Sequence, residues 1–501
     1  MSSELREIWT DAGGRAPAHW SFVRFEDLLA GPKSIAVGVM YPGSHDESGV
    51  PLIKVSDVKN GAVVAEPAFR ISELVNHEYR RTSLCGNELL ITLVGNPGDC
   101  AIVDDSMAGW NAARALAVVR LKDPTIRPWL RYVLLSSTAK HLIDARLNTT
   151  VQKTLNLKDI RSLPIPIAPQ VERNTIVETA AALEHKINVN LQINQTLEQM
   201  AQAIFKSWFV DFEPVKAKIA ALEAGGSEED ALRAAMQAIS GKGEAELTRL
   251  QAEQPEQYTE LRTTAELFPS AMQESELGEI PEGWNVTRVN EIAEIVKGKS
   301  YKSAELEPSQ TALVTLKSFN RGGGYRLDGL KEYTGKYKSQ QEVMAGDLII
   351  AYTDVTQAAD VIGKPAMVIG DERYEHLVIS LDVAVIRPVD SALKPYLYGL
   401  AKTDTFQYHT KAHTTGTTVL HLAKNAVPEY PLALPSKALI DAYAGQATPL
   451  FTLINEKVQE SRSLESLRDT LLPKLLSGEL SMPSTIDQLV AEPQRAEREA
   501  T

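Results

Sequence analysis

Cysteine is nearly absent from this chain, and long apolar runs are missing. Only Cys85 and Cys100 occur in 501 residues, which excludes a disulfide framework and a four-thiolate zinc site. We expect both to be small core residues. No apolar run approaches the roughly 20 residues of a membrane helix, and the chain does not begin with the basic and then apolar pattern of a secretory signal. The sequence therefore predicts a cytoplasmic protein without a membrane partner.

Catalytic motifs are missing as well. There is no GxSxG elbow, no GxGxxG, no HExxH and no Asn/Asp-Pro-Pro-Tyr tetrapeptide of the amino-methyltransferases. The stretch 298–300 (Gly-Lys-Ser) imitates the end of a phosphate-binding loop, but Ala293 stands where that loop begins with glycine. His409 and His413 have a spacing that suits a metal, without a supporting motif. We expect no catalytic residue, no metal and no cofactor on this chain.

The distribution of charge decides how the net charge of -13 is interpreted. A strongly acidic chain argues against a phosphate backbone as partner. Residues 213–282, however, hold 15 acidic and 6 basic side chains, a net charge of -9. The remainder of the chain is nearly balanced, so the overall acidity does not exclude DNA.

The chain contains an internal repeat of about half its length. The segment 51–61 resembles 312–322, 86–92 resembles 345–351, and 115–120 resembles 381–387. The Thr-Thr stretch and the Pro-rich strand that follow at 149–169 recur at 417–435. The order is kept at a nearly constant offset, which indicates two copies of one domain.

Each copy predicts a mixed, strand-rich domain that leads into a long helix. Short β-branched segments alternate with Gly, Asn and Asp turns. We predict an α+β fold with two repeated domains and two long antiparallel coiled-coil helices. The predicted boundaries are 18–169 and 281–436 for the domains, 170–212 and 437–478 for the helices, 213–280 for an acidic helical insertion or linker, and 479–501 for a disordered tail.

The helices carry apolar residues at alternating steps of three and four, which is typical of a coiled-coil seam. Asn190 and Asn194 fall on the seam of the first helix; such residues specify register or partner, and an exposed stretch would give the same pattern. The second seam, which includes Leu467, is less regular, and Pro473 and Gly478 are expected to end it. The residues predicted to pack are Leu183, Ile187, Leu197, Ile204, Trp208, Leu450, Ile454, Leu464 and Leu471.

Helices of about 40 residues span about 60 Å, so a paired spacer with a domain near each end is able to reach two DNA segments about 34–36 Å apart. Because the two domains differ in sequence, the predicted target is split and non-palindromic.

Basic and aromatic residues supply the candidate DNA contacts. Residues 297–338 carry nine basic and four acidic side chains, a net charge of +5, and interleaved tyrosines. A solvated strand face would look similar. The candidates here are Lys297, Lys299, Tyr301, Lys302, Lys317, Arg321, Tyr325, Arg326, Lys336 and Lys338; the first half offers fewer, namely Lys54, Lys59, Arg80, Arg81 and Arg146.

The repeated Thr-rich loop is the second candidate. Short hydroxyl and amide side chains reach base edges or phosphates without crowding, although strand-capping turns have the same composition. The residues are Thr149, Thr150, Gln152 and Lys153 in one half and His413, Thr414, Thr415 and Thr417 in the other.

Four motifs resemble the specificity subunits of type I restriction-modification systems. They begin at Leu163 (LPIPIAPQVER), Ile204 (IFKSWFVDFEPV), Pro281 (PEGWNV) and Leu467 (LRDTLLPKLLSGEL), and the similarity covers about residues 18–482. Each motif is weak alone, and the set in this order is specific. The acidic segment 214–280 departs from the pattern, which leaves the spacer length open.

The resemblance implies two target-recognition domains that read double-stranded DNA, held apart by the helix pair. It also implies two modification subunits that bring S-adenosylmethionine, and motor-nuclease subunits that bring ATP and Mg²⁺. An alternative is a two-headed protein-interaction adaptor that does not bind DNA, which the overall acidity favours. An enzyme is a third possibility, and methylation by the isolated chain would support it.

Overall fold

The computed structural model describes residues 2–59, 61–63, 66–147, 153–355 and 358–480. The chain divides into two units, residues 1–186 with 464–501, and residues 187–463. Two long helices, α6 (Gln170–Phe209) and α14 (Lys437–Ser477), each contribute to both units. Of the tail predicted at 479–501, all but the first two residues lie outside the described part of the chain.

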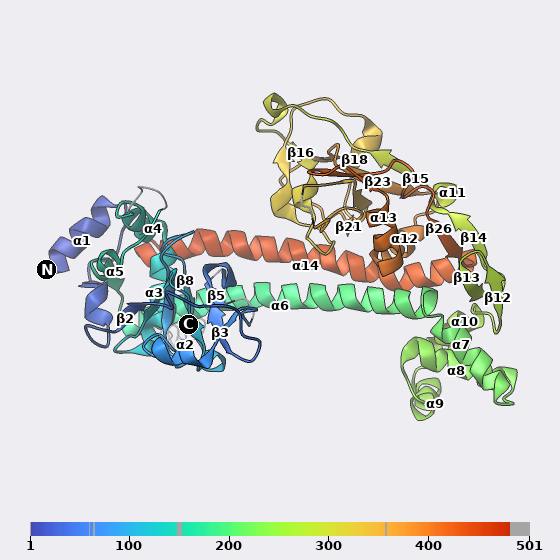
Figure 1. The fold of residues 1–501 in the computed structure, drawn as a ribbon, viewed down its shortest axis with the longest axis horizontal. Coiled ribbons are helices and arrows are strands. Elements are labelled where there is room, and N and C mark those ends of the chain that lie inside the picture. Colours follow the sequence, from blue (N-terminus) through green and yellow to red (C-terminus); the bar gives the residue numbers. More distant parts are fainter. Residues whose placement is uncertain (1, 60, 64–65, 148–152, 356–357, 481–501) are drawn as a thin grey trace, which may run out of the picture. The chain divides into compact units, whose positions relative to one another are not determined.

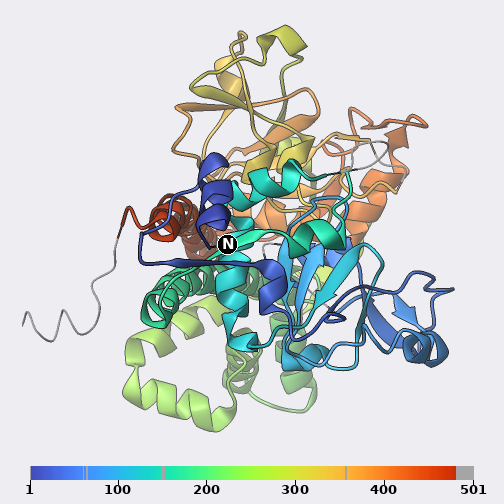
Figure 2. The same ribbon diagram turned by 90° about the vertical axis from the view of Figure 1, so that its left-hand side faces the viewer.

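The first unit is built on a four-stranded antiparallel sheet in the order β2-β10-β7-β8, whose strands are blue to cyan in Figure 2. The central strands β7 and β10 are buried throughout and consist mainly of Leu, Val and Ile, as expected for strands covered on both faces. A shorter strand, β3, pairs antiparallel with β6 and parallel with β9. The elements are α1 (Ser2–Asp11), β1 (Ser21–Arg24), β2 (Ile35–Val37), β3 (Val50–Ile53), β4 (Val58–Lys59), β5 (Ala62–Val63), β6 (Arg70–Ile71), α2 (Glu73–Glu78), β7 (Leu89–Thr92), β8 (Cys100–Ile102), β9 (Asn111–Ala112), β10 (Leu116–Val119), α3 (Arg127–Leu135), α4 (Ser137–Asp144), α5 (Leu157–Arg161) and β11 (Pro164–Ile167).

The second unit repeats the main features of this architecture. Its main sheet has the order β15-β23-β19-β21, β16 pairs parallel with β22, and β14 pairs with β26 as β1 pairs with β11. The elements are β14 (Asn285–Arg288), α11 (Val289–Ile292), β15 (Ala293–Lys297), β16 (Thr311–Val314), β17 (Lys331–Glu332), β18 (Glu342–Val343), β19 (Leu348–Ala351), β20 (Thr353–Asp354), β21 (Pro365–Met367), β22 (His376–Ile379), β23 (Val383–Pro388), α12 (Leu393–Lys402), α13 (Asp404–Ala412), β24 (Thr414–Thr415), β25 (Leu420–Leu422) and β26 (Pro431–Leu434). The predicted α+β fold with a repeated domain is confirmed.

The helices α6 (green in Figure 1) and α14 (red) are unbroken over 40 and 41 residues. In the second unit they run antiparallel, since Asn190 meets Ser461 while Ala201 meets Tyr443. In the first unit, Ile176 and Ala180 of α6 share a core with the end of α14. The residues predicted to pack all lie buried or half-buried: Leu183, Ile187, Leu197, Ile204, Trp208, Leu450, Ile454, Leu464 and Leu471.

Two expectations for α14 were wrong. Leu467, which the seam pattern includes, is 45% exposed. Pro473 does not end the helix, which continues to Ser477 and stops before Gly478 at φ 71°. A proline removes one backbone donor, and the buried side chains of Leu475 and Leu476 hold the last turn in place. Glycine accepts the left-handed conformation after a helix without strain.

The acidic segment after α6 forms four helices in the second unit: α7 (Glu213–Glu223), α8 (Glu228–Ser240), α9 (Glu244–Glu253) and α10 (Pro255–Glu266). They enclose a small core that contains Met236, Leu247 and Tyr258. A hairpin of β12 (Met272–Ser275) and β13 (Gly278–Pro281) follows.

The two cysteines differ in environment. Cys100 is fully buried in the first unit, and burial raises the pKa of its thiol to about 12. Cys85 is exposed, which corrects the expectation that both belong to the core. It lies in the turn before β7, where its backbone N–H donates to the Glu88 carboxylate.

Candidate nucleic-acid interface

The first half presents its basic candidates in separate segments: Lys54 and Lys59 around β4, Arg80 and Arg81 after α2, and Arg146 and Lys153 after α4. Lys54 is half-buried with its amine 3.8 Å from the centre of the Phe69 ring. Arg146 is half-buried and donates to the Leu142 carbonyl oxygen at 2.7 Å. The exposed candidates are Lys59, Arg80, Arg81 and Lys153, whereas Thr149, Thr150 and Gln152 lie outside the described residues.

In the second half, the chain between β16 and β17 folds back on itself and gathers three candidates. Two short 3-10 turns, 316–318 and 327–329, pack together, and Arg326 donates its backbone N–H to the Ser318 carbonyl oxygen at 2.8 Å. This contact brings Lys317 and Arg326 to one loop, with Arg321 at its tip, and all three are exposed. Arg326 is paired with Asp328, so Lys317 and Arg321 carry most of the charge offered here.

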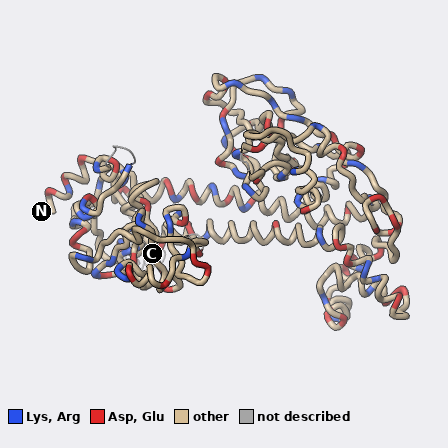
Figure 3. Tube along the Cα trace, in the orientation of Figure 1, with Lys and Arg blue, Asp and Glu red and all other residues tan. Residues whose placement is uncertain are grey.

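Two candidate tyrosines are less accessible than the lysines beside them. Tyr301 is half-buried in a small cluster with Tyr333 and Tyr337, and its hydroxyl accepts from the Lys331 amine at 3.3 Å. Lys299 is half-buried, and the exposed candidates nearby in sequence are Lys302, Lys336 and Lys338. Lys and Arg recur along the loops near β16 and β18 in Figure 3.

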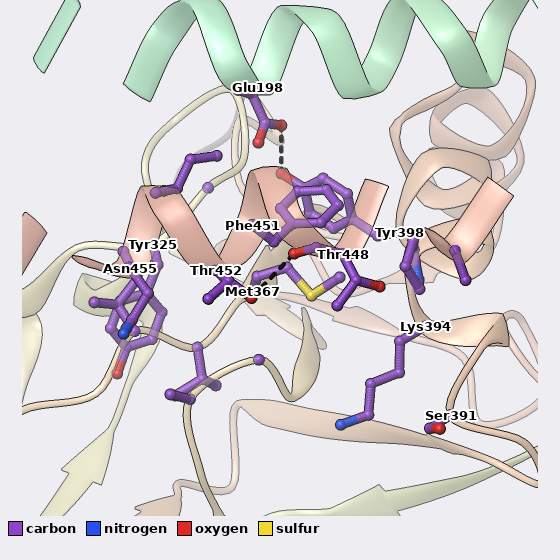
Figure 4. Close-up of a pocket in the computed structure, with 18 of the residues that line it drawn as sticks. Glu198, Tyr325, Met367, Ser391, Lys394, Tyr398, Thr448, Phe451, Thr452 and Asn455 are labelled. Atoms are coloured by element: carbon purple, nitrogen blue, oxygen red, sulfur yellow. Dashed lines mark hydrogen bonds between the residues drawn. The ribbon is translucent and has the colours of Figure 1, made fainter. Parts of the chain in front are cut away.

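Tyr325 lines a cavity of about 650 Å³ within the second unit, together with Tyr398, Phe451 and Asn455 (Figure 4). Its hydroxyl is buried and has no hydrogen-bond partner in the described part of the chain. Burial, and then the charge of Asp371, raise the pKa of this phenol. The placement argues against a direct DNA contact by Tyr325.

The Thr-rich loop of the second half forms β24 and β25, and β25 pairs antiparallel with both β24 and β20. Thr414 and Thr415 turn their hydroxyls to backbone carbonyl oxygens of Lys411 and His421. His413 and Thr417 are exposed. The His413 ring stacks on His409 at a centroid distance of 4.0 Å. His413 and Thr417 are therefore the members of this loop best placed to reach a ligand.

A group of lysines beside this loop joins the predicted Lys297 to four lysines that were not among the sequence candidates, namely Lys364, Lys402, Lys411 and Lys424. Burial lowers the pKa of Lys364, and the charges of Lys411 and Lys402 lower it further. Burial likewise lowers the pKa of Lys297, with a contribution from Lys424. Neighbouring positive charges destabilise one another, and a phosphate would reduce this repulsion. At Lys364, the charges of Asp404 and Asp360 already offset part of it. Apart from Lys297, these lysines are dispersed along the sequence, so no local run of basic residues indicated them.

In each half, one glutamate of α6 accepts hydrogen bonds from the domain that packs on the helix. In the first unit, Glu184 accepts from Arg131 at 2.8 Å and from the Tyr132 hydroxyl at 3.1 Å. In the second unit, Glu198 accepts from the Tyr398 hydroxyl at 2.5 Å (Figure 4) and lies 3.4 Å from the Lys402 amine. The partners of both glutamates come from equivalent helices, α3 and α12, so the attachment is part of the repeat.

No group of acidic, His or Cys side chains in the described ranges is arranged to hold a metal ion. Among the same residues, no helix has the length and apolar character needed to cross a membrane.

Comparison with known proteins agrees with the motifs. No family model matches the sequence. The chain is 28% identical over 442 residues to the type I restriction enzyme HindI specificity subunit of Haemophilus influenzae, covering 85% of this chain and 90% of that protein. The MjaIX specificity subunit of Methanocaldococcus jannaschii is 20% identical over 483 residues, 93% and 95% of the two chains. A solved type I S subunit from M. genitalium matches 91% of this chain and 96% of its own, with a TM-score of 0.48 and 15% identity.

Two relatives of the same kind match over 85% or more of both partners. The chain is thus similar, over most of its length, to specificity subunits of type I restriction enzymes.

Proposed function

We propose that this chain selects the DNA site of a type I restriction-modification complex, by reading a bipartite, asymmetric sequence with its two halves. One observation carries the proposal. The same α+β domain is built twice in one chain, with the framework repeated and the exposed loop residues different. Identical domains would favour a palindrome, whereas unlike domains on one scaffold suit two unlike half-sites.

The helices α6 and α14 are proposed to position two methyltransferase subunits, with motor-nuclease subunits joining the assembly. The seam of α6 is buried, while Leu191 and Met200 on the same helix remain exposed. These two side chains are nine positions apart, so they lie on opposite sides of the helix, and each offers a single apolar contact to a partner subunit. Methyl transfer and cleavage would be the work of those subunits, which would supply S-adenosylmethionine, ATP and Mg²⁺; the residues of this chain would only bind and orient DNA.

Genome-wide detection of N6-methyladenine tests the proposal. Cells that hold this chain with its modification subunit are compared with cells that lack this chain alone. Loss of one split, asymmetric methylated motif is expected. An unchanged methylome, with the modification subunit present and active, would contradict the proposal.

A second candidate, a protein-interaction adaptor, is favoured by the net charge of -13 and by the folded acidic helices α7–α10. A gel shift of the assembled complex at low and high salt separates the two. DNA binding that weakens steeply with salt is expected of a DNA reader, whereas indifference to DNA at low salt would favour the adaptor.

A further inference from the structure

Both halves contain the same isolated parallel β-bridge, between Val39 and Ala113 in the first and between Lys299 and Ser380 in the second, and we call this bridge the crossing. In the first half, Val39 donates its N–H to the Ala112 carbonyl oxygen at 2.7 Å and accepts from the Arg114 N–H at 2.9 Å. In the second half, Lys299 donates to Ile379 at 2.8 Å and accepts from Leu381 at 2.8 Å. The crossing therefore aligns Val39 with Lys299 and Arg114 with Leu381, position by position.

A glycine at the same place in each half makes the crossing possible. A Cβ on Gly38 would lie 2.0 Å from the Ala112 carbonyl oxygen, and one on Gly298 would lie 2.4 Å from that of Ile379. Any larger residue would push the two segments apart. The alignment consequently extends along the chain beyond each glycine, and Tyr41 of the first half corresponds to Tyr301 of the second.

The two halves share the backbone of the crossing, but the side chains at equivalent positions differ in chemistry or in exposure. The first half presents Tyr41, which is 77% exposed, and Arg114, which is also exposed. Neither side chain has a hydrogen-bond or ionic partner among the residues that the structure describes. At the matching places, the second half has the half-buried Tyr301 and Leu381, which is 54% exposed.

The chemistry of the first-half pair suits the edges of bases. An arginine donates two parallel hydrogen bonds to guanine O6 and N7 in the major groove. An aromatic ring stacks on a base or packs on a thymine methyl group. Tyr41 gains nothing from its exposure in the free chain, since an apolar ring in water is unfavourable, and contact with DNA would remove this cost.

We propose that Arg114 and Tyr41 are base-contacting, specificity-determining residues of the first half, and that Leu381 occupies the corresponding reading position of the second. This inference rests on the proposed DNA-reading function. It adds residues that no local charge pattern indicates, because Arg114 stands alone between apolar segments and Tyr41 has no basic neighbour in sequence. Different chemistry at equivalent positions is what two unlike half-sites require.

The test uses the chain assembled with its methyltransferase subunits. The probes are synthetic duplexes that carry the methylated motif, with each base pair replaced in turn. The variants are Arg114→Ala and Leu381→Arg, and the control is Arg15→Ala, which removes an exposed arginine elsewhere in the first unit. All three side chains are exposed, and unchanged unfolding temperatures would establish that the variants fold.

We expect Arg114→Ala to lose discrimination at one base-pair position by roughly 5- to 150-fold, the range of one bidentate contact. Leu381→Arg is expected to change the preferred base in the other half-site alone, and Arg15→Ala to change neither. Uniform weakening on all duplexes would mark Arg114 as a phosphate contact and overturn the proposal, as would effects of both variants in one half-site. A wild-type complex without any sequence preference would instead overturn the proposed function, and this is seen before variants are compared.

Discussion

The fully buried carboxylate of Glu88 accepts a hydrogen bond from Arg120 Nε at 3.1 Å, and it also accepts from the backbone N–H of Cys85. The second half repeats this relationship with Asp347, which accepts from Arg387 at 3.3 Å and from the Met344 N–H at 3.1 Å. In both halves the carboxylate stands just before a central strand and ties the preceding turn to the end of the neighbouring strand. The pair is thus part of the repeated framework and not of the DNA surface.

Replacing Glu88 by Gln should destabilise the first unit by about 2–3 kcal/mol, because the buried Arg120 contact loses its charge and an amide meets backbone donors. Chemical denaturation followed by tryptophan fluorescence measures this loss. The control is Glu26→Gln in the exposed pair with Arg24, for which a change of about 0–1 kcal/mol is expected. Equal effects of the two variants would contradict a structural role for Glu88.

Asn190 is fully buried in the helix pair and donates to Glu460 at 3.1 Å and to Ser461 at 3.3 Å. Asn190→Asp should destabilise the pair by several kcal/mol, since a carboxylate would be buried beside Glu460. Asn188→Asp, at an exposed position two residues earlier on α6, is the matched control and should have little effect. Thermal unfolding of the full chain distinguishes the two variants.

Charged residues in the seam of α6 should abolish helix pairing and capture of the methyltransferase subunits. The variant carries Glu at Leu183, Ile187 and Leu197, all of which are buried or half-buried. Gln195→Glu is the control, because Gln195 is exposed on the same helix. Co-purification and helical circular dichroism report the outcome, and retained pairing in the triple variant would refute the seam.

Asp371 should make the second unit sensitive to acid. Burial opposes its charge, but hydrogen bonds from Arg373 and from Arg462 on α14 outweigh burial and lower the pKa of this carboxyl. A carboxyl with a depressed folded pKa contributes stability above its unfolded pKa of about 4, and that stability is lost as the pH falls through the folded value. Asp371→Asn should therefore lower the unfolding temperature at pH 7 and lessen its decline in acid. The neighbouring exposed residue supplies the control, Glu372→Gln, which should leave the pH profile unchanged.

Lys364 and Lys411 should act through phosphates if the proposed function holds. The double variant Lys364→Ala with Lys411→Ala is expected to weaken DNA binding equally on all sequences. It should also reduce the slope of log K against log salt by about 0.9 for each phosphate that the variant no longer neutralises. Lys242→Ala, between the acidic helices α8 and α9, is the control and should leave the slope unchanged. A change in base preference would contradict a phosphate role.

Local sequence was sufficient to predict the elements in which apolar residues recur at regular intervals. The alternation of apolar residues along α6 and α14 predicts long helices, because a helix brings every third and fourth residue to one face. The internal repeat predicts one domain built twice, because two similar sequences fold alike. Neither conclusion needs contacts between distant residues.

Tertiary contacts decided what each side chain is free to do. Tyr325 and Tyr41 are both tyrosines in polar surroundings of the sequence, yet the Tyr325 hydroxyl is buried while Tyr41 is exposed. Cys85 is exposed although its residue type favours the core, and Lys364 lies near Lys402 and Lys411 although many residues intervene. Exposure and charge proximity depend on which distant segments pack together, and a one-dimensional pattern carries no record of that packing. The sequence alone thus determined the repeated domain and the paired helices, whereas the folded chain decided which residues of each half are available to DNA.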